Sequence, residues 1–236
     1  MNSKKVKKME SFSTREITVQ TDFCKNAYGS VLFGMGDTKV ICAVNISEDV
    51  PDHSKRKNKG WLSAEYTMLP YSTSSRIKRE FTKRDGRSVE IQRLVGRSLR
   101  AGIDLGKIPG FSIFIDCDVI QADGGTRTAS ITGGYIALKL AVDRMLKDGL
   151  ITENPLISNI AAISVGVIDN VIHLDLDYEK DSNADVDMNV VMNGNFDFIE
   201  IQGTGEQTPF SILQLDGMLK AAEAGIRELI KIQNLY

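Results

Sequence analysis

Apolar residues recur along this chain with the two periods that distinguish strands from helices. Alternation at every second position predicts strands, because successive side chains of a strand point to opposite faces. We expect strands at residues 16–20, 29–33, 38–46, 61–69, 113–119, 160–168, 171–176, 187–192 and 196–202. Apolar repeats at three and four residues predict helices, at residues 87–105, 128–147 and 211–232.

Short turns join several of these predicted strands. Glycine, asparagine and aspartate favour hairpins at residues 34–37, 169–170 and 193–194. Residues 49–59 are expected to form a loop. Hairpins combined with helices predict mixed β-sheets packed against helices, an α/β fold of the α+β type. No long linker or repeat divides the sequence, so we predict a single domain over residues 1–236, with residues 1–14 as a basic N-terminal extension.

A glycine pair joins a predicted strand to a predicted helix in the middle of the chain. Gly124 and Gly125 can adopt backbone conformations that other residues avoid. A helix N-terminus after such a turn presents free N–H groups and the positive end of the helix dipole, which together favour an anion. Arg127 adds a planar guanidinium suited to phosphate. The alternative is an ordinary strand-to-helix turn with a surface arginine, and this stretch alone fits both.

The two halves of the chain carry opposite charge. Through Arg127 there are 22 lysines and arginines against 15 acids, and 7 against 16 follow, which gives formal charges of +7 and −9. Residues 71–87 concentrate six cations: Arg76, Lys78, Arg79, Lys83, Arg84 and Arg87. This density favours contact with a polyanion, although a charge run is also typical of a solvated surface.

An acidic segment at residues 175–189 is the second candidate for chemistry. Asp181 and Asp187 lie six residues apart, and Ser182 and Asn183 between them can turn the chain and bring the two carboxylates together. Carboxylates without soft ligands nearby favour Mg²⁺ or Mn²⁺ over zinc. A solvated acidic loop is the alternative. Apolar residues fill the opposite face of the strand, so an inward-facing Asp187 would need a cation to offset the loss of water.

The overall composition, 42% hydrophobic and 25% charged, is that of a globular protein. No apolar run approaches the roughly 20 residues that span a bilayer, and the N-terminus lacks the apolar stretch of a signal peptide. We therefore expect no membrane contact. Cys24, Cys42 and Cys117 have no metal-ligand spacing, so we expect them to be buried and reduced in the cytoplasm. Two histidines leave little material for a histidine-based triad or zinc site.

Several segments, taken together and in order, resemble the ribonuclease PH family of phosphate-dependent 3′-exoribonucleases. The longest reads Asp-Cys-Asp-Val-Ile-Gln-Ala-Asp-Gly-Gly-Thr-Arg-Thr-Ala-Ser-Ile-Thr-Gly at residues 116–133. The others lie at residues 29–32, 36–40, 64–70, 86–87, 90–100 and 185–192. The resemblance extends over residues 15–226, and ordered segments of this length are far more specific than one glycine turn.

The resemblance implies a ribonuclease PH-like fold and phosphorolysis of RNA. In this family inorganic phosphate attacks the 3′-terminal phosphodiester of tRNA precursors and releases a nucleoside diphosphate. It implies phosphate binding by Arg87, Gly125, Thr126 and Arg127. It implies catalytic and metal-binding roles, with Mg²⁺ or Mn²⁺, for Asp181 and Asp187. RNA contact would fall to Arg76 and Arg79, and the assembly would be a homohexamer, a trimer of dimers.

The chain departs from the family pattern in three places. An N-terminal Arg-x-Asp-Gly-Arg pattern is missing, Tyr71 stands where an arginine is expected, and the loop between Arg79 and Arg87 is shortened. These differences affect RNA binding more than chemistry. A non-catalytic RNA-binding ring subunit, or a catalytic subunit that requires a different partner chain, is the alternative. Non-catalytic relatives lose the phosphate arginine or the aspartate pair, and here all four residues are present.

Overall fold

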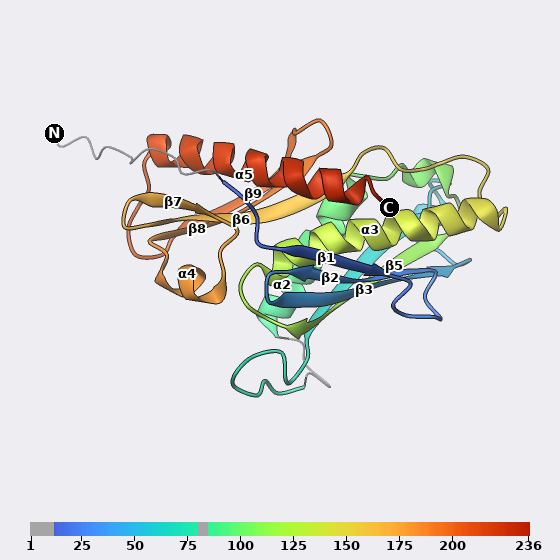
Figure 1. Ribbon diagram of the computed structural model, residues 1–236. Helices are drawn as coiled ribbons and strands as arrows, with labels where there is room; N and C mark the ends of the chain where they lie inside the picture. The colour runs from blue at the N-terminus through green and yellow to red at the C-terminus, as the bar shows by residue number, and fades with distance from the viewer. Residues whose placement is uncertain (1–11, 80–84) are drawn as a thin grey trace.

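One long helix, α3 (Thr126–Lys147), packs against both β-sheets of this protein. The computed structural model describes residues 12–79 and 85–236. In Figure 1 the N-terminal end of α3 faces the second sheet, and its C-terminal end lies on the opposite side of the molecule. Core residues from both sheets and from α3 form one continuous apolar cluster.

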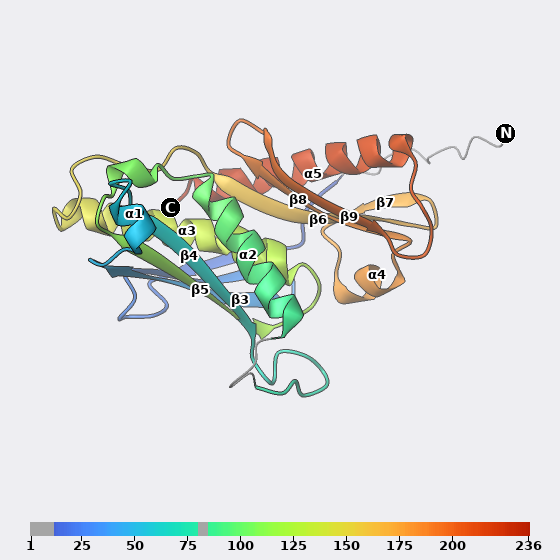
Figure 2. The ribbon, with the colours of Figure 1, turned by 180° about the vertical axis from the view of Figure 1, so that it is seen from behind.

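The first sheet has five strands in the order β1-β2-β3-β5-β4. Neighbours are antiparallel except β4 and β5, which are parallel. Helix α2 (Gly86–Arg100) packs on β4 and α3, as Figure 2 shows from behind. The strand bounds are β1 Ile17–Thr21, β2 Gly29–Met35, β3 Thr38–Ser47, β4 Trp61–Met68 and β5 Ser112–Gln121.

The second sheet is antiparallel throughout, in the order β7-β6-β8-β9. Helix α5 (Ile212–Gln233) packs on β6, β7 and β8 and begins with a capping box, in which Ser211 and Gln214 satisfy each other's backbone N–H groups. The strand bounds are β6 Ile160–Ile168, β7 Val171–Leu174, β8 Val186–Asn193 and β9 Phe198–Gly205.

Small residues allow α3 to lie close to the first sheet and to α2. A Cβ on Gly133 would stand 2.7 Å from the Cβ of Phe33, and a Cβ on Gly134 would stand 3.2 Å from Leu99. Larger side chains at these positions would push the helix outward, because buried cores hold few voids that could absorb them. The close packing therefore fixes where the N-terminus of α3 lies.

The mixed sheets and the three long helices confirm the predicted fold class, while several boundaries were wrong. The segment at 49–59 contains the short helix α1 (Asp52–Lys55), and the predicted helix at 87–105 ends at Arg100. After this end the chain passes close to β6, where a Cβ on Gly102 would stand 2.6 Å from Ile160. A 3₁₀ turn, η1, follows at Leu105–Lys107.

The acidic segment, predicted to turn at Ser182 and Asn183, forms helix α4 (Tyr178–Asn183). Asp177 begins α4 by accepting a hydrogen bond from the Lys180 N–H at 2.8 Å. Strand β9 starts at Phe198 instead of residue 196, since Phe196 adopts a left-handed conformation with φ of 66°.

The remaining predictions concern the cysteines, membrane-spanning helices, the N-terminal extension and the shortened loop. Cys42 and Cys117 are buried as expected, whereas Cys24 is only half-buried. Over residues 12–79 and 85–236, no helix is both long and apolar enough to cross a membrane. Most of the basic N-terminal extension, residues 1–11, and residues 80–84 of the shortened loop lie outside the described residues.

Candidate active site

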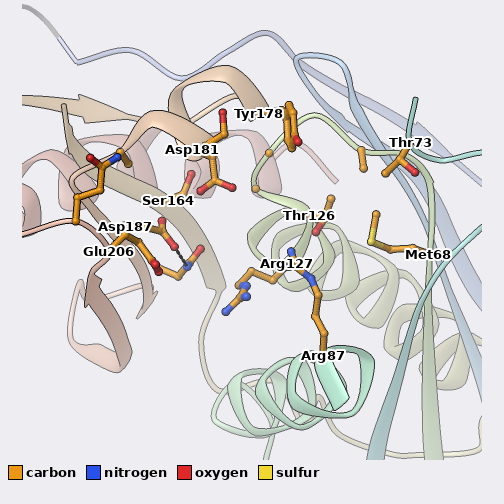
Figure 3. Close-up of a pocket in the computed structure, with 17 residues that line it drawn as sticks. Met68, Thr73, Arg87, Thr126, Arg127, Ser164, Tyr178, Asp181, Asp187 and Glu206 are labelled. Carbon is orange, nitrogen blue, oxygen red and sulfur yellow. Dashed lines mark hydrogen bonds between the residues drawn. The ribbon is translucent and has the colours of Figure 1, made fainter. Parts of the chain in front are cut away.

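An open cavity of about 670 Å³ lies at the N-terminal end of α3, lined by residues of both sheets. Figure 3 shows the charged side chains that surround it. Six of the eight predicted site residues line this cavity: Arg87, Gly125, Thr126, Arg127, Asp181 and Asp187. They come from α2, the glycine turn, the first turn of α3, α4 and β8, so segments 100 residues apart in the chain meet here.

The glycine turn has the conformation that the sequence predicts. Gly124 and Gly125 have φ of 71° and 65°, in the left-handed region that favours glycine. A Cβ on Gly124 would collide with the backbone of Leu176 and Asp177, so the turn docks directly on the start of the acidic segment. Within residues 12–79 and 85–236 no side chain caps α3, and the first N–H groups of a helix have no partner within it. The turn therefore directs unpaired donors at the cavity.

Arg15 fastens this turn to the second sheet. Its Nη1 donates to the Asp123 carbonyl oxygen at 2.6 Å, and its Nη2 donates to Asp175 Oδ1 at 2.7 Å. The Arg15 N–H also donates to Asp175 Oδ2 at 2.8 Å. Because the side chain of Asp175 is fully buried, this pair holds the turn and the start of the acidic segment in a fixed relation. Sequence reasoning missed Arg15, whose position before β1 gives no local signal.

Two guanidinium groups provide the positive charge of the cavity. Arg127 Nη1 donates to Gln202 Oε1 at 3.1 Å and lies 3.7 Å from Glu90 Oε2, which directs the side chain across the cavity. Arg87 is exposed and makes no hydrogen bond or ion pair within the described part of the chain. The Arg87 guanidinium is therefore available to an anion.

Two carboxylates face these arginines. Burial raises the pKa of Asp181, while the nearby Arg87 and Arg127 act to lower it. Burial and the neighbouring Asp181 raise the pKa of Asp187 to about 6. Asp187 Oδ1 is buried and has no hydrogen-bond partner among the described residues, and Asn189 Nδ2 lies 3.5 Å from Oδ2. A buried carboxylate oxygen without a donor is unfavourable, and a bound cation would satisfy it.

The carboxylate pair fits a hard divalent cation. No cluster of three or more histidine, cysteine or acidic side chains suited to a metal occurs among the described residues. Mg²⁺ nevertheless binds through one or two carboxylates when water and substrate phosphates complete its coordination. Asp181 and Asp187 line the same cavity, and the unpartnered Asp187 Oδ1 is the oxygen that such a cation would neutralise.

The two predicted RNA contacts, Arg76 and Arg79, lie outside the cavity lining and are exposed. Thr73 of the same segment does line it, so this basic segment approaches the cavity at one point. Sequence reasoning missed other residues here. Tyr66 places its hydroxyl 2.9 Å from Thr126 Oγ1 at the base of the turn, and Tyr178 belongs to the cavity wall.

Comparison with known proteins gives the family. Domain 1 of the 3′ exoribonuclease family matches residues 13–142, and domain 2 of the same family matches residues 158–225. The chain therefore belongs to the 3′ exoribonuclease family. Ribonuclease PH of Neisseria meningitidis serogroup C is 51% identical over 223 residues, which cover 94% of this chain and 92% of that protein. Ribonuclease PH of Crocosphaera subtropica is 51% identical over 93% of this chain and 92% of that protein. Within the family, the chain thus groups with ribonuclease PH.

Solved structures show the same fold at lower sequence identity. Rice (Oryza sativa) Rrp46 superposes with a TM-score of 0.77 at 16% identity, covering 96% of each chain. A chain of the Archaeoglobus fulgidus exosome with RNA bound to the active site superposes with a TM-score of 0.76 at 19% identity, covering 93% of this chain and 88% of that one. At such identities the likeness confirms the fold alone.

Proposed function

We propose that this protein is a phosphate-dependent 3′-to-5′ exoribonuclease that trims the 3′ ends of tRNA precursors and releases nucleoside diphosphates. Its relatives at 51% identity are ribonuclease PH along nearly their whole length. The observation that carries the proposal is the meeting of two arginines, a glycine turn at a helix N-terminus and two carboxylates around one cavity. A ring subunit without activity would not need this combination.

The positive side of the cavity binds the attacking phosphate. Arg87 and Arg127 supply guanidinium groups, while Gly125 and Thr126 present N–H groups at the positive end of the α3 dipole. Phosphate already carries a nucleophilic oxygen, so the site needs no histidine base. The residues instead orient the anion and offset the charge that accumulates in the transition state.

The acidic side of the cavity acts on the RNA end. Asp181 and Asp187 would hold Mg²⁺ or Mn²⁺, which supplies positive charge to the phosphodiester oxygens when bound. Burial and Asp181 raise the pKa of Asp187, and its Oδ1 accepts no hydrogen bond from the described residues. Both observations support this assignment, because a cation held by the two carboxylates would offset their charge. Asn189 Nδ2 lies 3.5 Å from Asp187 Oδ2 on the same strand.

The RNA chain leaves the cavity past the basic segment that contains Thr73. Arg76 and Arg79 are exposed beyond that point and would contact phosphates of the RNA body. Phosphate contacts of this kind increase affinity without reading sequence, and they weaken with salt. Tyr71 is exposed in the same segment and contributes no charge to this contact.

The protein would act in the cytoplasm as a homohexamer, a trimer of dimers, built from single-domain subunits. The single apolar core that joins both sheets supports one domain, although two family models cover its halves. Sedimentation or light scattering of the purified chain tests the assembly. A hexamer is expected, and a monomer with full activity would contradict it.

Phosphate dependence tests the activity. Nucleoside diphosphate release from a tRNA precursor should rise with phosphate concentration to saturation and should disappear in Asp187→Ala. Binding of the RNA should persist in that variant, because Arg76 and Arg79 are unchanged. Turnover that is independent of phosphate, or unaffected by Asp187→Ala, would contradict the proposed function.

A further inference from the structure

A tyrosine forms part of the cavity wall without a role in the proposed chemistry. Tyr178 is 67% exposed although it lines the cavity. It is the only aromatic residue among those described residues that line the cavity. In Figure 3 its ring stands at the rim, between Asp181 on one side and Thr73 on the other. A large exposed aromatic ring beside charged groups suggests a ligand surface.

The backbone that carries this ring is held in place. The Tyr178 N–H donates to Asp123 Oδ1 at 3.2 Å, which joins the first residue of α4 to the glycine turn. The next turn of α4 is closed by a hydrogen bond from the Asp181 N–H to the Asp177 carbonyl oxygen at 2.8 Å. Residues three apart lie on the same face of a helix, so Tyr178 and Asp181 face the cavity together. The ring position is thus coupled to both the turn and the carboxylate.

The reaction leaves one part of the substrate without a partner among the residues assigned so far. An oxygen of inorganic phosphate forms a bond to the phosphorus of the terminal nucleotide. The bond from this phosphorus to the 3′ oxygen of the preceding nucleotide breaks, and that oxygen takes the proton that the phosphate carried. The arginines, the turn and the aspartates all act on phosphate groups. The base of the departing nucleotide needs a surface that accepts any of the four bases.

Building on the proposed function, we propose that Tyr178 is the stacking surface for the 3′-terminal base of the RNA and of the nucleoside diphosphate product. An aromatic face binds every base through its π-face, whereas hydrogen bonds to base edges would select one. Tyr178 lies in the same cavity as the phosphate-binding turn, so a nucleotide whose phosphate meets the turn can place its base on the ring. Tyr178 would therefore hold the terminal nucleotide without sequence preference.

A substrate without the terminal base provides the sharpest test. Two RNA oligonucleotides are compared, identical except that one ends in a stable abasic ribonucleotide. The wild-type protein should degrade the normal end about 10 to 100 times better in kcat/KM than the abasic end. Tyr178→Ala should lower kcat/KM for the normal end by a similar factor, mainly through KM for RNA, and should remove the discrimination. The KM for phosphate should stay within about twofold.

Matched variants separate stacking from other roles of this position. Tyr178→Phe keeps the ring and should retain wild-type discrimination, whereas Tyr178→Leu keeps apolar bulk without a π-face and should lose most of it. Equal losses on both RNA ends in Tyr178→Ala, or full discrimination in that variant, would overturn the proposal. Failure of the wild-type protein to release diphosphates would instead overturn the proposed function itself.

Binding provides a readout that does not depend on turnover. Calorimetry in the presence of Mg²⁺ compares ADP, which carries a base, with pyrophosphate, which does not. Tyr178→Ala should weaken ADP binding about 10-fold or more and leave pyrophosphate binding unchanged. Equal weakening of both ligands would assign Tyr178 to the phosphate site and contradict a stacking role.

Discussion

The guanidinium of Arg15 lies 2.7 Å from the buried carboxylate of Asp175, and this pair connects the two sheets behind the candidate active site. Arg15 also donates to the Asp123 carbonyl oxygen, just before the glycine turn. Asp175 has φ of 54° and begins the acidic segment that leads to Asp181. The glycine turn and the carboxylates are therefore positioned by a contact outside the cavity.

Loss of this pair should destabilise the protein. Arg15→Ala leaves the Asp175 carboxylate buried without its partner, which should lower the free energy of unfolding by about 3 kcal/mol. Asp175→Asn keeps the left-handed backbone conformation, since asparagine tolerates it. In a double-mutant cycle measured by urea unfolding, the combined loss should be smaller than the sum of the single losses by at least about 1 kcal/mol. Strictly additive losses would exclude the coupling.

Gly124 and Gly149 form a matched pair for testing the docked turn. Their φ angles are 71° and 72°, so alanine is strained equally at both positions. A Cβ at Gly149 meets nothing within 4 Å, whereas one at Gly124 collides with the Leu176 and Asp177 backbone. Gly149→Ala should cost about 1 kcal/mol of stability and leave the KM for phosphate unchanged. Gly124→Ala should cost more and raise the KM for phosphate, and equal effects of the two variants would contradict the account.

Removal of the Arg127 guanidinium should weaken phosphate use. Arg127→Ala deletes one charge-assisted contact, which should cost about 2 to 4 kcal/mol of transition-state stabilisation. The kcat/KM for phosphate should therefore fall roughly 30-fold to 1000-fold. Lys220→Ala serves as the control, because Lys220 pairs with Asp216 on the exposed surface of α5. Steady-state kinetics with varied phosphate measure both variants. A comparable loss in Lys220→Ala would mean that the effect is not specific to the cavity.

Asp187→Asn should stabilise the metal-free protein while removing activity. Burial raises the pKa of Asp187 to about 6, so the folded chain binds this proton more tightly than the unfolded chain. The folded state therefore loses stability as pH rises from about 4 to about 6. At pH 7 in EDTA the variant should be more stable by on the order of 1 to 3 kcal/mol, and at pH 4 the difference should vanish. Destabilisation at pH 7 would show that the carboxylate already has a partner.

The sequence predicted most of the secondary structure because the relevant signals are local. Alternation along β5 and the glycine pair before α3 each specify their structure within a few residues. The same holds for the paired left-handed residues Asp169 and Asn170, which form the turn between β6 and β7. The six predicted site residues that line the cavity could be named because the ordered family segments identified them. Their residue types indicated the chemistry.

Features that depend on contacts between distant segments could not be predicted. The role of Arg15 depends on Asp123 and Asp175, which lie more than 100 residues away. Helix α4 is too short for a periodic pattern and is fixed by its Asp177 cap and by the contact between Tyr178 and Asp123. Arg127 is oriented by Gln202 of β9, another partner that no local signal identifies.

The fate of the phosphate tests the central claim most directly. The protein is incubated with a tRNA precursor, Mg²⁺ and radiolabelled inorganic phosphate, and the products are separated by chromatography. Phosphorolysis predicts that the label enters the terminal phosphate of nucleoside diphosphates, one labelled diphosphate for each nucleotide removed. Release of unlabelled nucleoside monophosphates, with no requirement for phosphate, would contradict the account.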